Sequence, residues 1–151
     1  MSLVNVFKSI QQNNYSNALN QLRRIRVQGT SISAYRKIHS LITSSLEKLV
    51  AINPSNVTAD ILTNILSELT STALLIEYQK ERRLISNDIA DGLYRVILDL
   101  IREIEACLTN LNRGTSSIDR DRINKVQSMA RAIKVIIDGI VALNYRYFSR
   151  T

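Results

Sequence analysis

The stretch that decides the fold is residues 86–111, SNDIADGLYRVILDLIREIEACLTNL. Its apolar side chains recur every three or four residues, a spacing that is typical of a helix with one buried face. Ser86, Asn87 and Asp88 supply an N-terminal cap and an acidic first turn. The pattern predicts a long amphipathic helix that Gly114 ends, with this apolar stripe: Ile89, Leu93, Val96, Ile97, Leu100, Ile104, Cys107, Leu108 and Leu111.

Helical periodicity continues on both sides of this stretch. A second long stripe runs over residues 118–143 after Ser117, and a third over residues 61–76 after a capping Thr58. Toward the N-terminus we expect a short helix from Ser2 that ends at residues 13–14, and a second helix from Tyr15, with Leu19 on its apolar stripe and a stop at residue 29. A further helix begins after residues 30–31 and stops before the proline at position 54.

No segment shows sustained alternation of apolar and polar residues, so we expect no strand. The sequence predicts an all-α fold, a bundle of five to six mostly antiparallel helices in a single domain over residues 1–151. Within it we expect basic N-terminal helices over 1–53 and a long-helix bundle over 58–148. The three long helices would form the spine.

Composition narrows the class of protein. The chain has 151 residues, 45% hydrophobic and 22% charged, which is ordinary for a globular domain with its own core. One cysteine allows no internal disulfide, and one cysteine with one histidine makes no structural zinc site. We find no apolar run near the 18 to 20 residues that span a bilayer, and no signal peptide, and therefore expect a cytoplasmic protein without a membrane partner.

The charges are segregated along the chain. Residues 1–46 contain six basic and no acidic residues, a net charge of +6. Residues 47–111 carry −4 and residues 112–151 carry +5, so the formal total is +7. Arginine outnumbers lysine by 14 to 6. Such segregation concentrates positive potential, and guanidinium groups suit phosphate, although a merely solvated basic face has the same signature.

Catalytic signatures are nearly absent. His39 has no identifiable partner for nucleophilic catalysis, and Cys107 sits among apolar residues, as a buried thiol does. The four glycines form neither a phosphate loop nor a dinucleotide fingerprint. Carboxylate pairs at 77 and 81 or at 88 and 91 could hold Mg²⁺, but local ion pairs with Lys80, Arg82 and Arg83 are the simpler interpretation. We expect no enzyme, no cofactor and no bound metal.

The first candidate site surrounds the turn at residues 29–31. Five basic residues flank it, three before the turn and two after it: Arg23, Arg24, Arg26, Arg36 and Lys37. The hydroxyls of Thr30, Ser31 and Ser33 and the free N–H groups of the next helix would add phosphate ligands. We interpret this turn as a site for a phosphate backbone, the alternative being an exposed basic turn that binds nothing.

The second candidate site is the C-terminal run of residues 144–150, NYRYFSR, in which aromatic residues alternate with arginines. Such a patch can stack bases and pair with phosphates. Tyr147 continues the apolar stripe of the last helix and is assigned to the core, which leaves Tyr145, Arg146 and Arg150 as binding residues. Arg131 and Lys134 of the same helix complete the candidate set. We expect contacts with the backbone of RNA or single-stranded DNA, without readout of a base sequence.

The C-terminal segment, with residues 132–133 (AI) followed by residues 138–148 (DGIVALNYRYF), resembles the closing helix of the helical small subunits of CRISPR effector complexes. The basic, all-helical, non-catalytic character of the chain is similar too. The resemblance implies a non-catalytic subunit of an antiviral ribonucleoprotein, present in several copies beside other subunits. It implies backbone contacts with guide RNA and target strand.

Two other families stay open. Residues 77–85, EYQKERRLI, followed by Ile89, Leu93 and Tyr94, are similar to the helical domain of the archaeal GINS replisome scaffold. A helical capsid or DNA-packaging protein of an archaeal filamentous virus is the third possibility. Its acid-free residues 1–46 would then be an arm laid along duplex DNA.

Overall fold

The computed structural model describes residues 2–112 and 120–149. Within these ranges all regular structure is helical, which confirms the predicted all-α class. Gly114 and Ser117, which we expected to end one helix and open the next, lie outside the described residues. The helices are α1 (Ser2–Gln11), α2 (Tyr15–Leu22), α3 (Ile32–Val50), α4 (Ala59–Glu81), α5 (Asn87–Asn112), α6 (Arg120–Leu143) and α7 (Tyr145–Phe148).

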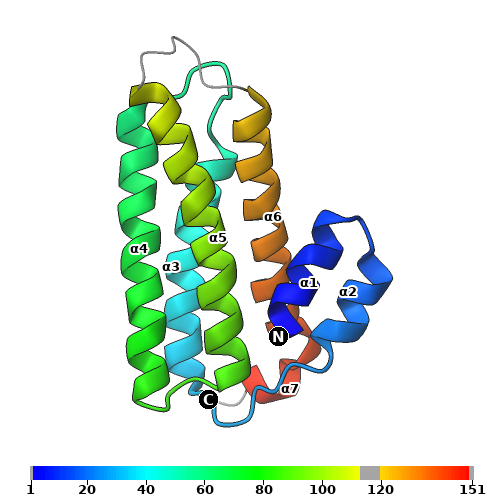
Figure 1. Cartoon of the computed structure of the whole chain (residues 1–151). Coiled ribbons are helices and arrows are strands. Elements are labelled where there is room, and N and C mark those ends of the chain that lie inside the picture. The colour runs from blue at the N-terminus through cyan, green and yellow to red at the C-terminus, as the bar shows by residue number, and fades with distance from the viewer. Residues whose placement is uncertain (1, 113–119, 150–151) are drawn as a thin grey trace.

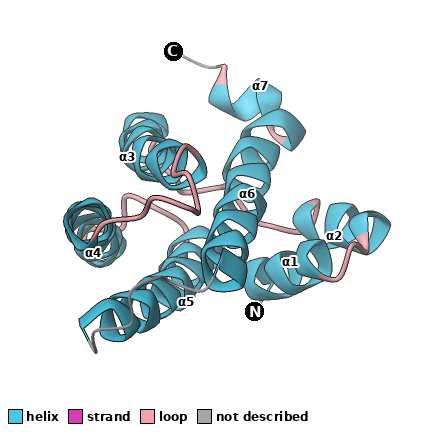
Figure 2. Cartoon of the chain, turned by 90° about the horizontal axis from the view of Figure 1, so that it is seen from above, coloured by secondary structure: helices cyan, strands magenta, loops and turns pink. Residues whose placement is uncertain are grey.

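Four of these helices, α3 to α6, form an antiparallel bundle (Figure 1). Helix α3 packs against α4 and α6, and α5 packs against the same two helices, so the four surround one core (Figure 2). Each contributes fully buried side chains, such as Ile38, Leu69, Leu100 and Ile133. The helix over residues 32–50 is therefore the fourth member of the bundle, although its basic charge groups it with the N-terminal helices in the sequence.

The hairpin of α1 and α2 lies outside the bundle, against α5 and α6 (Figure 2). Leu3 and Phe7 are buried there. A Cβ added at Gly92 of α5 would overlap the Cβ of Leu3, and one added at Gly139 of α6 would meet the tip of Leu22. These two glycines thus permit close helix approach, a role that their scattered positions in the sequence did not indicate.

Helix α2 is shorter than its sequence pattern predicts. We expected it to continue to Gly29, but it ends at Leu22 and an irregular segment over residues 23–31 follows. Ile25 and Val27 are buried and Arg26 between them is exposed, so alternate side chains face the bundle. Tyr15 and Leu19, expected on the apolar stripe, are exposed, and Ala18 takes the buried position instead.

Helix ends follow the predicted caps. The hydroxyl of Thr58 accepts a hydrogen bond from the N–H of Ile61 at 3.3 Å, and the hydroxyl of Ser86 accepts one from Ile89 at 3.4 Å. Helix α3 ends at Val50, before the proline as expected. At the other end of the chain Asn144 leaves the helical conformation, with φ −122° and ψ 36°, and separates α7 from α6.

Helix α4 corrects the expectation that the chain has no apolar run long enough to span a bilayer. Among the described residues, α4 is long and apolar enough to cross a bilayer by length and composition, whereas we found no such run in the sequence. A helix in the core of a soluble bundle passes the same test. Leu62, Leu69 and Ile76 of α4 are fully buried in the bundle core, whereas Ile61 and Leu74 are exposed.

Candidate nucleic-acid interface

Segments far apart in the sequence meet at one end of the bundle, the lower end in Figure 1, which we call the basal end. The segment over residues 23–31 crosses the turn between α4 and α5, and three hydrogen bonds join them. Ser31 N–H donates to the carbonyl of Leu84 at 2.7 Å, and Ser86 N–H donates to Thr30 Oγ1 at 3.0 Å. The hydroxyl of Ser86 donates to the carbonyl of Arg26 at 2.7 Å. The segment is therefore fixed in place.

Helix α7 closes the same end. The hydroxyl of Tyr147 donates to the carbonyl of Thr30 at 2.5 Å, and Arg36 Nη2 donates to the carbonyl of Phe148 at 3.0 Å. The ring of Phe148 packs on that of Tyr35, with 4.9 Å between centroids. The two candidate sites of the sequence, around residues 23–37 and 144–150, thus adjoin. Tyr147 is half-buried, in agreement with its assignment to the core.

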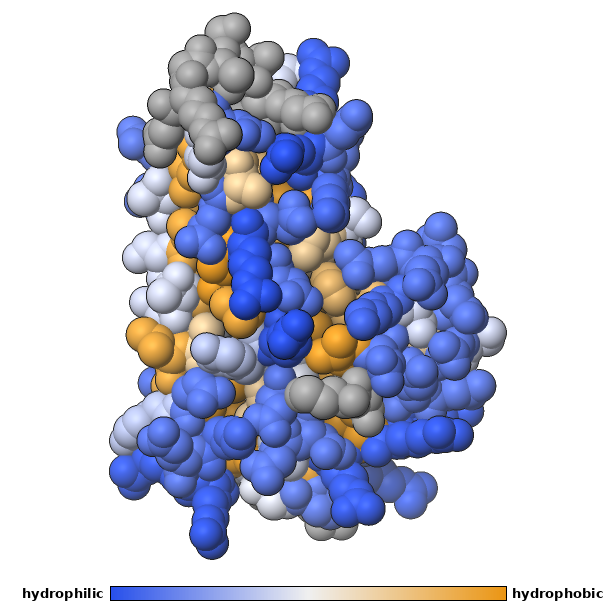
Figure 3. Space-filling model, viewed as in Figure 1, coloured by the Kyte–Doolittle hydropathy of each residue, from blue (hydrophilic) through white to orange (hydrophobic). Residues whose placement is uncertain are grey.

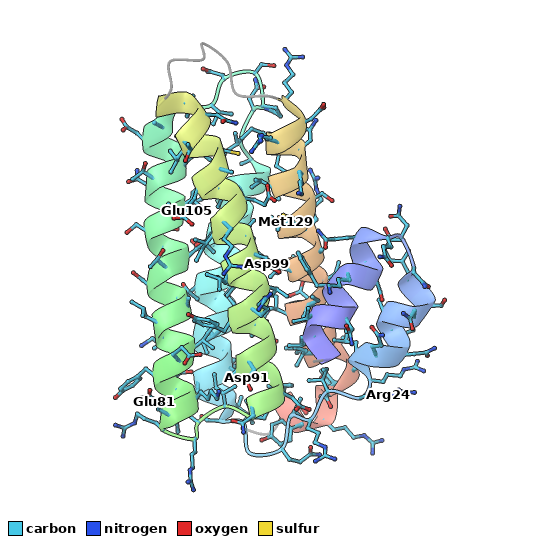
Figure 4. The ribbon with its side chains drawn as sticks, in the orientation of Figure 1. Arg24, Glu81, Asp91, Asp99, Glu105 and Met129 are labelled. Carbon is cyan, nitrogen blue, oxygen red and sulfur yellow. The ribbon has the colours of Figure 1, made fainter. Side chains whose placement is uncertain are left out.

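This juxtaposition gathers exposed cationic side chains from four segments, and we call them the basal arginine surface. Hydrophilic residues cover the lower end of the molecule in Figure 3, and in Figure 4 Arg24 projects outward at the foot of α2, to the side of that end. All its members except Lys37 are arginines. The surface consists of Arg23, Arg24, Arg26, Arg36, Lys37, Arg82, Arg83 and Arg146.

In the described part of the chain these cations have no ion-pair partner, although two carboxylates lie at the same end: Asp88 at the backbone of Arg26, and Glu81 (Figure 4). Asp88 accepts from the backbone N–H of Arg26 at 3.1 Å instead. Arg82 lies over the ring of Tyr78, 5.5 Å from its centroid. The positive potential of this end is therefore open to an external anion.

Arg82 and Arg83 belong to this surface although the sequence analysis assigned them to local ion pairs. That assignment is wrong for both within the described residues, and Lys80 pairs with Asp91 of α5 rather than with a carboxylate of its own helix. The hydrogen bond from Lys80 to Asp91 raises the pKa of Lys80. The sequence does contain a signal, since two adjacent arginines lie three to four residues before the cap of the next helix at Ser86.

Arg83 also has an unusual backbone. It follows the C-cap of α4 in the left-handed region, with φ 59°, in a helix-terminating motif closed by a hydrogen bond from Leu84 N–H to the carbonyl of Gln79 at 2.9 Å. Glycine, or sometimes asparagine, normally occupies that position because other side chains are strained there. Asn13 occupies the equivalent position after α1. An arginine in place of glycine costs stability and adds a charge to the basal end.

The hydroxyl groups expected to bind phosphate are mostly used inside the protein. Thr30 is buried, with 3% exposure, and its hydroxyl accepts from Ser86. The hydroxyl of Ser31 accepts from Ala34 N–H at 3.3 Å. Ser33 is exposed and its hydroxyl lies 3.1 Å from that of Ser31. The expectation is therefore wrong for Thr30, because folding turns this residue toward the α4–α5 turn.

The remaining candidates lie higher on the bundle or outside the described residues. Arg131 and Lys134 border a groove of about 380 Å³ between α3 and α6. Lys134 already donates to Asp138 at 3.0 Å and to Thr43 at 3.4 Å. Tyr145 is 70% exposed beside Arg146. Arg150 is not among the described residues.

His39 has a partner that sequence reasoning missed. Its Nε2 lies 2.8 Å from Oδ1 of Asp138, 99 positions away on α6. Both residues line a cavity of about 560 Å³ between α3, α6 and α7. Ser149 lines it too, with its hydroxyl donating to the carbonyl of Arg146 at 3.2 Å. Burial, and then the charge of Asp138, raise the pKa of Tyr35, whose hydroxyl donates to the carbonyl of Ile137 at 2.7 Å.

No cluster of three or more histidine, cysteine or carboxylate side chains that could hold a metal ion occurs within residues 2–112 and 120–149. Cys107 is fully buried in the core. Comparison with known proteins gives no relative, since no family model, no curated protein and no solved structure matches the chain. A functional assignment therefore rests on its own residues.

Proposed function

We propose that this chain is a non-catalytic nucleic-acid-binding subunit that holds a phosphate backbone on its basal arginine surface. One observation carries the proposal: four segments bring exposed cations together at one end, and no ion pair neutralises them within the described residues. Neutralising phosphates releases counterions, which gives affinity without sequence readout.

The character of the surface favours phosphate over other anions. Guanidinium groups donate two parallel hydrogen bonds to phosphate oxygens, and arginines make up nearly all of the surface. Hydrogen bonds between segments also hold their backbones in place before any ligand arrives. Because these backbones are already ordered in the folded protein, binding loses less conformational entropy.

The resemblance to small subunits of CRISPR effector complexes provides a setting for this activity. In that setting the basal end would steady guide RNA and target strand, beside other subunits and further copies of the chain. The packaging alternative is less well supported because an arm laid along duplex DNA must be free of the bundle. Leu3, Phe7 and Ile38, all within residues 1–46, are buried in the core.

Fluorescence anisotropy with single-stranded RNA, single-stranded DNA and duplex DNA of equal length, across a salt series, tests the proposal. We expect binding at low salt that weakens steeply as salt rises. Replacing Arg23, Arg24 and Arg26 together with alanine should lower the affinity and reduce the slope of log affinity against log salt by about two.

The matched control removes the same charge elsewhere. Arg95, Arg102 and Lys125 are exposed and already paired with carboxylates, so their joint replacement by alanine should change the slope by less than about one. No binding to any of the three ligands at low salt, or equal losses in both triple variants, would overturn the proposal.

A further inference from the structure

The cavity between α3, α6 and α7 adjoins the basal arginine surface, and its lining differs from the rest of that end. We propose that it receives one unstacked base of a single-stranded nucleic acid and favours bases with an exocyclic amino group. This inference rests on the proposed function and names the ligand of its site more closely. The volume of about 560 Å³ lies within the range of small-ligand pockets.

One side of the cavity is aromatic and apolar. Phe148 is buried against Tyr35, while Val141 and Tyr145 extend the lining to the surface. Tyr145 is the most exposed aromatic ring among the described residues, at 70%. Every base has a π-face, so an exposed ring at the mouth of an apolar cavity is suited to stack one without regard to sequence.

The other side is polar and offers one anionic acceptor. Oδ1 of Asp138 lies 2.8 Å from Nε2 of His39 and 3.0 Å from Nζ of Lys134. The second oxygen of Asp138 accepts no hydrogen bond from the residues that the structure describes. A carboxylate repels phosphate but accepts from amino groups, which adenine, cytosine and guanine carry and uracil and thymine lack.

Cations on either side of the cavity fit the backbone of such a strand. Arg36 lines the cavity and uses one nitrogen on the carbonyl of Phe148, which fixes its orientation. Arg146 follows Tyr145 on α7 and is exposed. A base turned into the cavity would therefore leave its phosphates close to two guanidinium groups. A duplex has no unstacked base to offer, so the proposal also predicts a preference for single strands.

The stacking contact is tested with a strand that carries one 2-aminopurine, in RNA and DNA versions. Binding should quench its fluorescence, and Tyr145→Ala should abolish the quenching and weaken binding at least about fivefold. Tyr145→Phe should retain both. The matched control is Tyr15→Ala, since Tyr15 is 61% exposed on α2, away from the cavity. A difference between the two strands would report contacts with the 2′-hydroxyl.

The amino-group preference is tested with strands that differ only in cytosine or uracil at one position. We expect the protein to bind the cytosine strand more tightly and Asp138→Ala to remove the difference. If the carboxylate acted only through its charge, Asp138→Ala would tighten binding to both strands equally and leave any difference unchanged. Thermal unfolding of each variant confirms that it is folded.

Three results would overturn the inference: quenching that survives Tyr145→Ala, equal losses in the Tyr145 and Tyr15 variants, or no distinction between cytosine and uracil. Any of these with salt-dependent binding intact would leave the proposed function standing, and the cavity would then suit a side chain of a partner protein. Absence of all binding would remove both proposals together.

Discussion

The sides of the bundle and its basal end both carry exposed cationic side chains, but in the described part of the chain these are paired with carboxylates on the sides and unpaired at the basal end. On the sides, Lys48 pairs with Glu68, Lys125 with Glu103, and Arg95 and Arg102 share Asp99. At the basal end no arginine has a carboxylate partner within the described residues. Exposed ion pairs add little stability, but they cancel potential. The positions of the cations, rather than the net charge of the protein, therefore decide where an anion can bind.

The largest expected effect comes from reversing charge at the basal end. Arg82→Glu with Arg83→Glu removes two cations and adds two anions beside the phosphate, so affinity should fall on the order of a hundredfold at low salt. The same reversal at Arg95 and Arg102 should change affinity by less than about threefold. Anisotropy measures both, and similar losses would erase the distinction between the two regions.

A second prediction concerns the hairpin that positions residues 23–31. Gly92→Ala places a Cβ against the Cβ of Leu3, which is close to the backbone and cannot swing away. We expect a loss of about 1–3 kcal/mol in the free energy of unfolding. Gly139→Ala meets only the tip of Leu22, a flexible end, and should cost less. Urea denaturation compares the two, and the opposite order would contradict this packing.

Arg83 allows stability and binding to be separated. Arg83→Gly relieves the left-handed backbone and should raise stability by up to about 1 kcal/mol, while it weakens nucleic-acid binding by removing a cation. Asn13→Gly, at the equivalent position after α1, should change stability by only about a few tenths of a kcal/mol. It should leave binding unaltered because asparagine carries no charge. A destabilised Arg83→Gly would contradict the strain argument.

The smallest effect is expected from an ion pair on the side of the bundle. A hydrogen bond from Lys48 lowers the pKa of Glu68, outweighing partial burial, with a further contribution from Ser45. Because the folded-state pKa lies below the unfolded one, the stabilisation is present near neutral pH and is lost as pH falls through the folded-state value. Glu68→Gln should cost less than about 1 kcal/mol near pH 7 and converge with the unchanged protein in acid. Denaturation at several pH values measures this.

The local parts of the fold could be predicted from the sequence. Most of the stripe of α5, including Leu93 and Ile97, is fully buried, and only its end at Leu108 and Leu111 is partly exposed. The caps at Thr58 and Ser86 form as expected. Each of these features depends on residues three or four positions apart. The end of α2 was mispredicted because Ile25 and Val27 follow a period of two against the bundle, a pattern too short to outweigh the helical stripe.

The candidate site depended on contacts between distant residues. Arg82 and Arg83 joined the surface because Ser86 bonds to Thr30, 56 positions away, and His39 gained Asp138 from across the bundle. Local patterns contain no information on which helices become neighbours. The basic runs were visible in the sequence, whereas their meeting at one end was not.

The sequence by itself determined the helical class, the buried stripes and the number of cations, since helix periodicity and charge are properties of neighbouring residues. Only the tertiary structure decided which cations remain unpaired. It brought α7 onto residues 30 and 36, formed the cavity at Tyr145 and placed carboxylates beside the cations on the sides of the bundle. The physical reason is that an ion pair forms only when its two charged groups lie within about 4 Å of each other, and packing sets the distances between residues far apart in the sequence.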